Sequence, residues 1–175
     1  MSSFASAAAD VRAAVAAWFG VPAIPGVTRV YADQPWWAAG PSWDPLDATA
    51  GYGCIAFPHI SDQQEVREAF GGATGGLKMV RFQVGLVVLY KWTVPQVLPP
   101  GQDESAWVGP LDAVLEAIVE RLRSDRTLGG AVWQAGEAVG ADIKIGRDLP
   151  RLDKRGGTIQ SWQVVEFTVD APITA

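Results

Sequence analysis

Residues 78–92 read KMVRFQVGLVVLYKW, and this stretch decides the fold. Every second position from Val80 to Trp92 is β-branched, aromatic or leucine. In a strand these side chains all point to one face, whereas a helix would spread them around its circumference. The stretch exceeds the ~5–6 residues of an ordinary strand, and Gly85 is a natural place for it to bend. It therefore predicts the middle of a curved antiparallel sheet, with one end that projects beyond the core.

The other face of this strand begins polar and becomes apolar towards Trp92. Arg81 and Gln83 are its polar members, and Val87 and Leu89 follow them. The two polar residues could face a lumen or a neighbouring subunit, but an ordinary solvated sheet face explains them equally well. The sequence leaves both interpretations open.

The segments before this strand predict a helix and further strands. Apolar residues at helical spacing predict a first helix over 4–18, which Gly20 and Pro22 end. Residues 27–32 and 53–60 have the composition of strands. The helix and the strands that follow it begin an α+β arrangement.

A hairpin is expected to lead into the central strand. Pro58 marks an edge or a bulge in the strand that precedes it. Residues 61–70 begin like a helix but alternate like a strand. We favour the strand, because the glycine-rich run 71–76 then forms a hairpin tip.

The second half of the chain adds a helix and two strands. Pro110 suits the first turn of that helix. Strands are expected over 143–149 and 158–169, with a turn at Gly156–Gly157 between them. In the last strand, Trp162 and Val164 lie on one face and Val165, Phe167 and Val169 on the other, which indicates either a bulge or two covered faces. The buried stripe of the helix is Leu111, Val114, Leu115, Ile118 and Leu122. The fold class is therefore α+β, a single domain over 1–175 with a mainly antiparallel curved sheet, two flanking helices and a long projecting hairpin.

The composition bounds the possible partners. The chain has 175 residues, 49% of them hydrophobic, and a net charge of -5. An acidic chain is not attracted over its whole surface to nucleic acid or to an anionic membrane, and we expect neither as a binding partner. The first residues lack a signal-peptide pattern, and the single Cys54 cannot form an internal disulfide, so we expect an intracellular protein.

The residue types of common active sites are sparse. Cys54 and His59 lie five apart on a predicted strand, so their side chains leave opposite faces. A single histidine excludes a His-rich metal cluster. The glycine patterns at 51–56 and 71–78 precede strands rather than helices, which is the wrong context for nucleotide binding. We therefore predict no catalytic, cofactor-binding or metal residues.

A long Pro/Gly-rich loop over 33–51 is the most unusual segment. Loops of this length are uncommon within a compact domain and are usually functional or disordered, and we favour function. Three of its acids could meet around a cation, although loop acids are more often solvated: Asp33, Asp44 and Asp47. The chain has 8 tryptophans, and four of them are expected in loops: Trp36, Trp37, Trp43 and Trp107.

These aromatic loops and the hairpin are the candidate contact surfaces. A tryptophan in a long loop buries little area unless something covers it, so we expect two or more of the four to contact another chain. The hairpin supplies further candidate contacts to a subunit or partner: Gly71, Gly72, Thr74, Gly75 and Arg81.

Four stretches carry a resemblance to a known family. They are IPGVTRVY at 24–31, EAFGG at 68–72, RLRSDRTLGGAVWQAGE at 121–137, and the last strand from 160 to 169. With these segments in this order, the chain resembles the tail terminator (tail completion) proteins of long-tailed bacteriophages, in particular those of actinobacterial hosts. The helix followed by Arg-Thr-Leu-Gly-Gly is the most telling piece.

The resemblance implies a structural virion protein with no catalytic residues and no cofactor. Its members form a homohexameric ring at the head-proximal end of the tail, assembled in the host cytoplasm. The ring ends polymerisation of the major tail tube protein and offers a surface to the head-completion (stopper) protein. Genomic DNA passes through the channel without sequence-specific binding. An acidic chain fits such a conduit, because it does not trap DNA by releasing its counterions.

Two other interpretations stay open. One is another neck or minor tail component of similar α+β fold. The other, from a different class, is a small-molecule-binding or enzymatic domain that uses the loop 33–51 as a lid.

Overall fold

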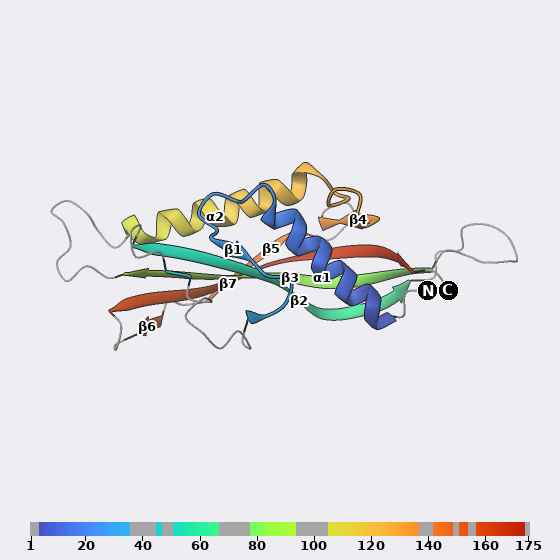
Figure 1. Cartoon of the computed structure of the whole chain (residues 1–175), viewed down its shortest axis with the longest axis horizontal. Coiled ribbons are helices and arrows are strands. Elements are labelled where there is room, and N and C mark those ends of the chain that lie inside the picture. Colours follow the sequence, from blue (N-terminus) through green and yellow to red (C-terminus); the bar gives the residue numbers. More distant parts are fainter. Residues whose placement is uncertain are drawn as a thin grey trace, which may run out of the picture.

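The structure is a computed structural model of the chain. It describes residues 4–35, 45–46, 51–66, 78–93, 105–136, 142–148, 151–153 and 157–173. The elements follow in the order α1 (Phe4–Gly20), β1 (Arg29–Val30), β2 (Tyr52–Val66), β3 (Lys78–Thr93), α2 (Ser105–Ser124), β4 (Gln134–Ala135), β5 (Lys144–Arg147), β6 (Arg151–Asp153) and β7 (Thr158–Ile173). Figure 1 shows an elongated molecule in which β2, β3 and β7 run along the long axis.

One curled sheet contains all of these strands. Its order is β1-β2-β3-β7-β4, and β5 and β6 also pair with β7. The pairs β2–β3 and β3–β7 are antiparallel, and only the short β1 pairs in parallel with its neighbour. The structure therefore confirms the α+β fold with a mainly antiparallel curved sheet, and it confirms β3 as its middle strand.

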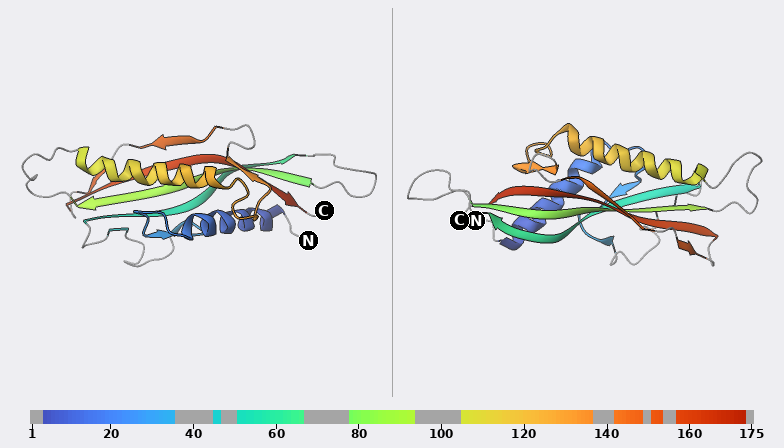
Figure 2. Two further views of the ribbon diagram at one scale, coloured as in Figure 1. Left: turned by 90° about the horizontal axis from the view of Figure 1, so that it is seen from above. Right: turned by 180° about the vertical axis from the view of Figure 1, so that it is seen from behind.

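The core lies between one face of the sheet and both helices. All the even-numbered side chains from Val80 to Trp92 are buried there, as the alternation predicted. They meet Val15 and Phe19 of α1, and Ile118 of α2. Figure 1 shows α1 crossing in front of the strands, and the view from behind in Figure 2 has the strands in front of α1. Both helices thus cover the same face.

β7 resolves the ambiguity of the last predicted strand. Its register with β3 runs without a shift from Lys78↔Ile173 to Thr93↔Thr158, so the strand contains no bulge. Val165 faces the helices, and Trp162 on the other face packs edge-on against Phe57 of β2. Both faces of β7 are therefore used, which was one of the two alternatives for this strand.

Pro58 lies on an outer edge, as expected. The carbonyls of Cys54 and Ala56 accept hydrogen bonds from the N–H groups of Thr28 and Tyr31, so these positions of β2 face β1. Alternation along the strand turns the next such position, Pro58, to the same side, where no described strand pairs with it. A proline there loses no ladder hydrogen bond.

The structure corrects several element boundaries. α2 begins at Ser105, so Pro110 is inside the helix rather than in its first turn, and Trp107 lies in the helix rather than in a loop. Proline removes only one backbone N–H donor from the helix. The buried apolar stripe that follows Pro110 stabilises the remaining turns. β1 has two residues rather than six. The residues predicted as two strands over 53–70 form the single strand β2 as far as Val66.

Candidate interaction surface

The hairpin of β2 and β3 is exposed along β2 near its turn, whereas β3 beside it stays buried as far as Val80 and Met79. Its register runs from Tyr52↔Trp92 to Val66↔Met79. The first half of β2 is buried, whereas every described side chain from Ser61 to Glu65 is exposed. The hairpin ends on the side of the molecule where Figure 1 places both termini.

Most of the predicted contact residues fall where the structure gives no description. Gly71, Gly72, Thr74 and Gly75 of the hairpin tip lie outside the described residues, and so do Trp36, Trp37 and Trp43. The backbone of Trp107 is described but its side chain is not. Their roles as contacts therefore stay predictions.

Arg81 is held near the turn end of the hairpin, close to the last described pair Val66↔Met79. Its Nε and Nη2 each donate a hydrogen bond of 2.9 Å to the carboxylate of Asp170, which lies opposite in β7. The Asp170 side chain is 10% exposed and that of Arg81 is 38% exposed. A two-point bond of this kind fixes both side chains and largely neutralises the guanidinium. Arg81 therefore ties β3 to β7, in addition to any contact it makes with another chain.

The outer edge of β2 is acidic near the hairpin turn. The register of β2 shifts between Ile60 and Asp62, so a bulge interrupts the strand there. Asp62 and Glu65 are exposed, and the segment 60–65 contains no lysine or arginine. A proline, a bulge and charges are features that discourage strands of another chain from pairing with an edge. We call residues 60–65 the β2 edge.

The opposite edge of the sheet is aromatic and basic. Trp133 is 54% exposed, and its backbone N–H donates to the carbonyl oxygen of Asp170. Beside it, a shallow depression is lined by Leu122, Arg123, Arg126, Ala135 and Ile143. Arg126 is exposed and makes no ion pair within the described part of the chain. We call Trp133 together with these five lining residues the β4 edge. Sequence reasoning missed Trp133 because its neighbours give no clear strand pattern.

The turn before Trp133 explains why the segment Arg-Thr-Leu-Gly-Gly has its sequence. The Asp125 carboxylate accepts hydrogen bonds from the hydroxyl and N–H of Thr127 and from the N–H of Gly129. These bonds, the Thr127 hydroxyl first, lower the pKa of Asp125. Leu128, Gly129 and Gly130 all have positive φ, which glycine tolerates best. The segment is therefore a fixed turn that carries α2 into β4.

Arg121 joins the ends of the two helices. Its Nε donates to the carbonyl oxygen of Trp18 at 2.8 Å, and its Nη2 donates to that of Val21. The guanidinium also lies over the Trp18 ring, 4.8 Å from its centre. Arg121 thus satisfies carbonyls at the end of α1, where a cation is favoured by the helix dipole.

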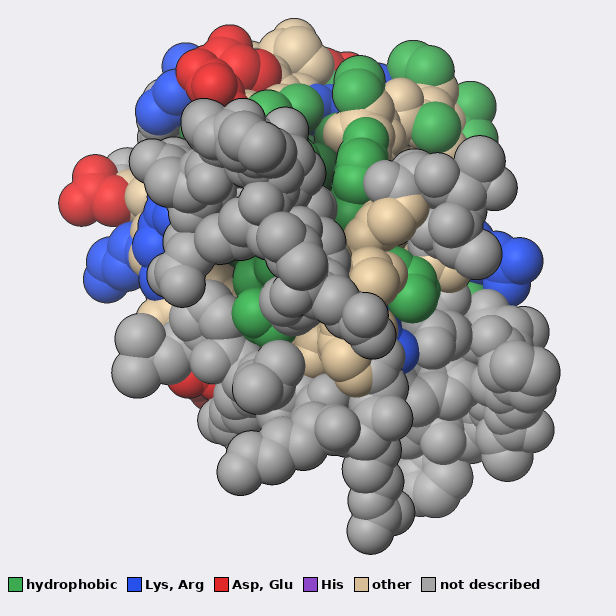
Figure 3. All heavy atoms as spheres, turned by 90° about the vertical axis from the view of Figure 1, so that its left-hand side faces the viewer, with side chains coloured by type: hydrophobic (Ala, Val, Ile, Leu, Met, Phe, Trp, Pro, Cys, Tyr) green, Lys and Arg blue, Asp and Glu red, His purple; other side chains and the backbone are tan. Residues whose placement is uncertain are grey.

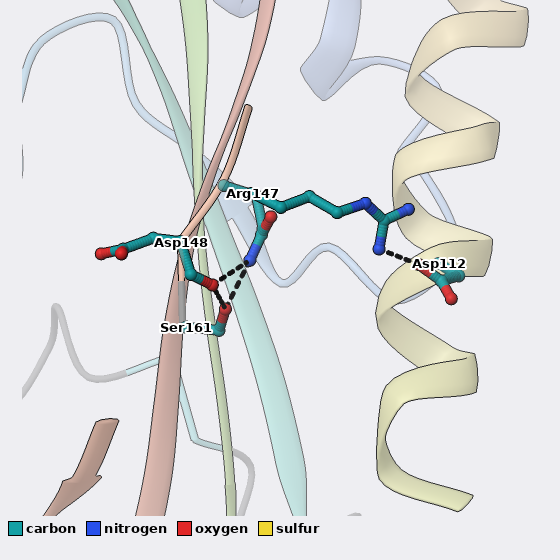
Figure 4. A network of polar contacts seen from close by, with 5 residues as sticks. Asp112, Arg147, Asp148 and Ser161 are labelled. Atoms are coloured by element: carbon teal, nitrogen blue, oxygen red, sulfur yellow. Dashed lines mark hydrogen bonds and ion pairs between the residues drawn. The ribbon is translucent and has the colours of Figure 1, made fainter. Parts of the chain in front are cut away.

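A second polar network fixes β5 against α2. Figure 4 shows Arg147 reaching from β5 to Asp112 of α2, with which it forms an ion pair. Behind it, the buried Gln163 amide donates to the carbonyl oxygen of Asp148 and to the Ser161 hydroxyl. These contacts anchor β5, whose four side chains are all exposed.

Cys54 and His59 do not form a pair. Cys54 packs in the core on the helix-covered face, where burial raises its pKa to about 12. His59 is exposed, and its position five residues further along β2 turns it to the other face. A thiol with so high a pKa is a poor nucleophile near neutral pH. Among the described residues, no three His, Cys, Asp or Glu side chains lie where they could hold a metal ion.

One end of the molecule carries described side chains of both charges. Figure 3 shows the end of the molecule that lies on the left in Figure 1, where acidic, basic and hydrophobic side chains occur together. None of the described helices is both long and apolar enough to span a membrane. Compared with protein-family models and with curated proteins, the chain matches none of them.

Proposed function

We propose that this chain is a tail terminator, a structural virion protein that assembles into a hexameric ring on the head-proximal end of a phage tail tube. In this role it ends polymerisation of the tube and joins the tail to the head-completion protein. The resemblance of four segments motivates the proposal. The observation that carries it is the hairpin of β2 and β3, because its outer strand exposes every described side chain from Ser61 to Glu65 near the turn.

A projecting hairpin is useful to a ring protein for a physical reason. A closed ring needs contacts between unlike surfaces of neighbouring copies, and an element that outruns its own core can reach the next copy. The Arg81–Asp170 bond and the long β3–β7 ladder hold β3 on the sheet close to the hairpin turn.

A tube-capping experiment tests the proposal. The major tail tube protein of the same virion is polymerised with and without the purified chain, and the tubes are examined by electron microscopy. We expect a ring at one tube end and arrested growth at that end. Tubes that elongate equally and carry no ring in the presence of the chain would contradict the proposal.

A shortened hairpin provides the matched variant for that experiment. Replacing residues 71–76 by a two-residue turn leaves β2 and β3 with their register up to Val66↔Met79. We expect a folded protein with an unchanged thermal midpoint that no longer caps tubes. Full capping by this variant would show that the hairpin tip is not the contact.

A further inference from the structure

The two outer edges of the sheet lie at the same level of the molecule. The register places Gln64 opposite Arg81, Arg81 opposite Asp170, and Asp170 opposite Gln134. These four residues form one row across β2, β3, β7 and β4. Adjacent strands lie about 4.8 Å apart, so the row is on the order of 15 Å wide. The β2 edge and the β4 edge are therefore the two ends of a single row.

The two edges carry opposite charge. The β2 edge contains Asp62 and Glu65 and no cation, whereas the β4 edge presents Arg126 and Arg123. Arg123 is partly compensated by Glu120 in its own helix, but Arg126 has no such partner in the described part of the chain. On the β4 edge, the Asp125 carboxylate accepts hydrogen bonds from its own turn.

We infer that the β4 edge of one copy docks on the β2 edge of the next copy, side by side. Trp133 supplies the anchor, because a half-exposed tryptophan beside arginines has the composition of an interface centre.

The charges exclude the symmetric alternatives. Two β4 edges facing each other would bring arginine against arginine, and two β2 edges would bring acid against acid. A contact between unlike edges repeats from copy to copy with all hairpins pointing the same way. The contact is made by side chains rather than by strand pairing, because Pro58 and the bulge after Ile60 interrupt the β2 edge. The inference rests on the proposed function, and it names the surfaces by which the ring closes.

Charge reversal tests the contact. The variants Arg126→Glu on one edge and Asp62→Lys with Glu65→Lys on the other all alter exposed side chains. We expect each edge variant to raise the dissociation constant between copies by about tenfold or more, since like charges then face each other. Trp133→Ala is expected to weaken the contact by a similar factor. Analytical ultracentrifugation over a concentration series measures all of these.

Combining the changes makes the test specific. A chain with both reversed edges should associate again, and so should an equimolar mixture of the two edge variants, because reversed edges complement each other. Lys144→Glu and Ile145→Ala on the exposed strand β5 are the matched controls and should leave association unchanged. Circular dichroism confirms that each variant is folded.

The outcomes separate this inference from the proposed function. If the wild-type chain forms closed rings that Arg126→Glu and the β2-edge reversal leave intact, the assigned surfaces are wrong and the ring stands. If reversal and rescue occur in open chains without ring closure, the surfaces stand and the ring is contradicted. A wild-type chain that stays monomeric both alone and on tube ends would overturn both.

Discussion

The bond between Arg81 and Asp170 shows how a single residue changes its meaning between sequence and structure. In the sequence, Arg81 is a polar side chain in an apolar strand, and a lumen, a subunit contact and a solvated face all explain it. In the structure it is bound at two points to an aspartate that lies 89 residues away. No local sequence pattern predicts such a partner, because the pairing of β3 with β7 depends on the register of the whole sheet.

The energetic value of this bond can be measured by a double-mutant cycle. Replacing Arg81 by alanine leaves the Asp170 carboxylate, whose side chain is 10% exposed, without its cation. We expect a coupling energy of about 1–3 kcal/mol from chemical unfolding of Arg81→Ala, Asp170→Ala and the double variant. The exposed pair Arg12–Asp33 is the matched control and should give less than about 1 kcal/mol. Equal coupling energies in the two pairs would show that burial does not strengthen the ion pair between Arg81 and Asp170.

Asp125 gives a pH dependence with a defined sign. Its folded pKa is lowered by hydrogen bonds from Thr127 and Gly129, so the ionised carboxylate stabilises the fold above the unfolded pKa near 3.8. That stabilisation is lost as the pH falls through the folded pKa. We therefore expect Asp125→Asn to lower the thermal midpoint at neutral pH and to approach the wild type below pH 3.8. A midpoint difference that does not depend on pH would contradict this role of the carboxylate.

At the scale of elements, the turn between α1 and β1 is fitted to α2. Gly26 has φ of 85°, and a Cβ built on it would lie 2.7 Å from Cγ2 of Val114. Any other residue there combines a left-handed backbone with a clash against the buried face of α2. The sequence shows only a Pro-Gly turn at this place, so the close approach to α2 becomes visible only in the fold.

A pair of glycine variants separates these two effects. Gly51 also has positive φ, at 74°, but nothing lies within 4 Å of its added Cβ. We expect Gly51→Ala to destabilise the protein by about 1–2 kcal/mol through the backbone alone. Gly26→Ala should cost more, by about 1–3 kcal/mol, because overpacking adds to the strain. Val114→Ala in the Gly26→Ala background removes the clashing methyl group. If it does not reduce the extra destabilisation of Gly26→Ala relative to Gly51→Ala, the clash is not the cause of that extra destabilisation.

The element scale also shows what the sequence was able to predict. The period of two in β3 and the stripe of α2 are strong local signals, and both predicted faces are buried. The strands β4 and β6 have two and three residues, too few for any period, and they exist because β7 offers its edge to them. The start of α2 was predicted too late in the chain, because proline is typical of the first turn of a helix and Pro110 therefore indicates a later start.

The candidate site was likewise predicted only where its residues form a local pattern. The sequence pointed to the hairpin and to aromatic residues, which are local features of the chain. It did not find the β4 edge, because Arg126, Leu122 and Ala135 come to line one depression only through the turn at Asp125 and the pairing of β4 with β7. Opposite charge on the two sheet edges is likewise a property of strand order, which no single segment contains.

At the scale of the whole molecule, the features above favour an asymmetric building block. The outer strand of the hairpin is exposed near its turn, and the two edges of the sheet differ in charge and in aromatic content. A block with two unlike edges repeats in one direction, and it makes a closed ring when the rotation between copies divides the circle. The number of copies is then the quantity on which the proposed tail-terminator role depends.

Native mass spectrometry of the wild-type chain at low salt, alone and bound to tail tube ends, measures that number most directly. The account predicts a discrete species at six times the 18.6 kDa chain mass, with no continuous ladder of larger assemblies. A chain that remains at its single mass under both conditions, or that forms an open-ended series of masses, would contradict the proposed ring.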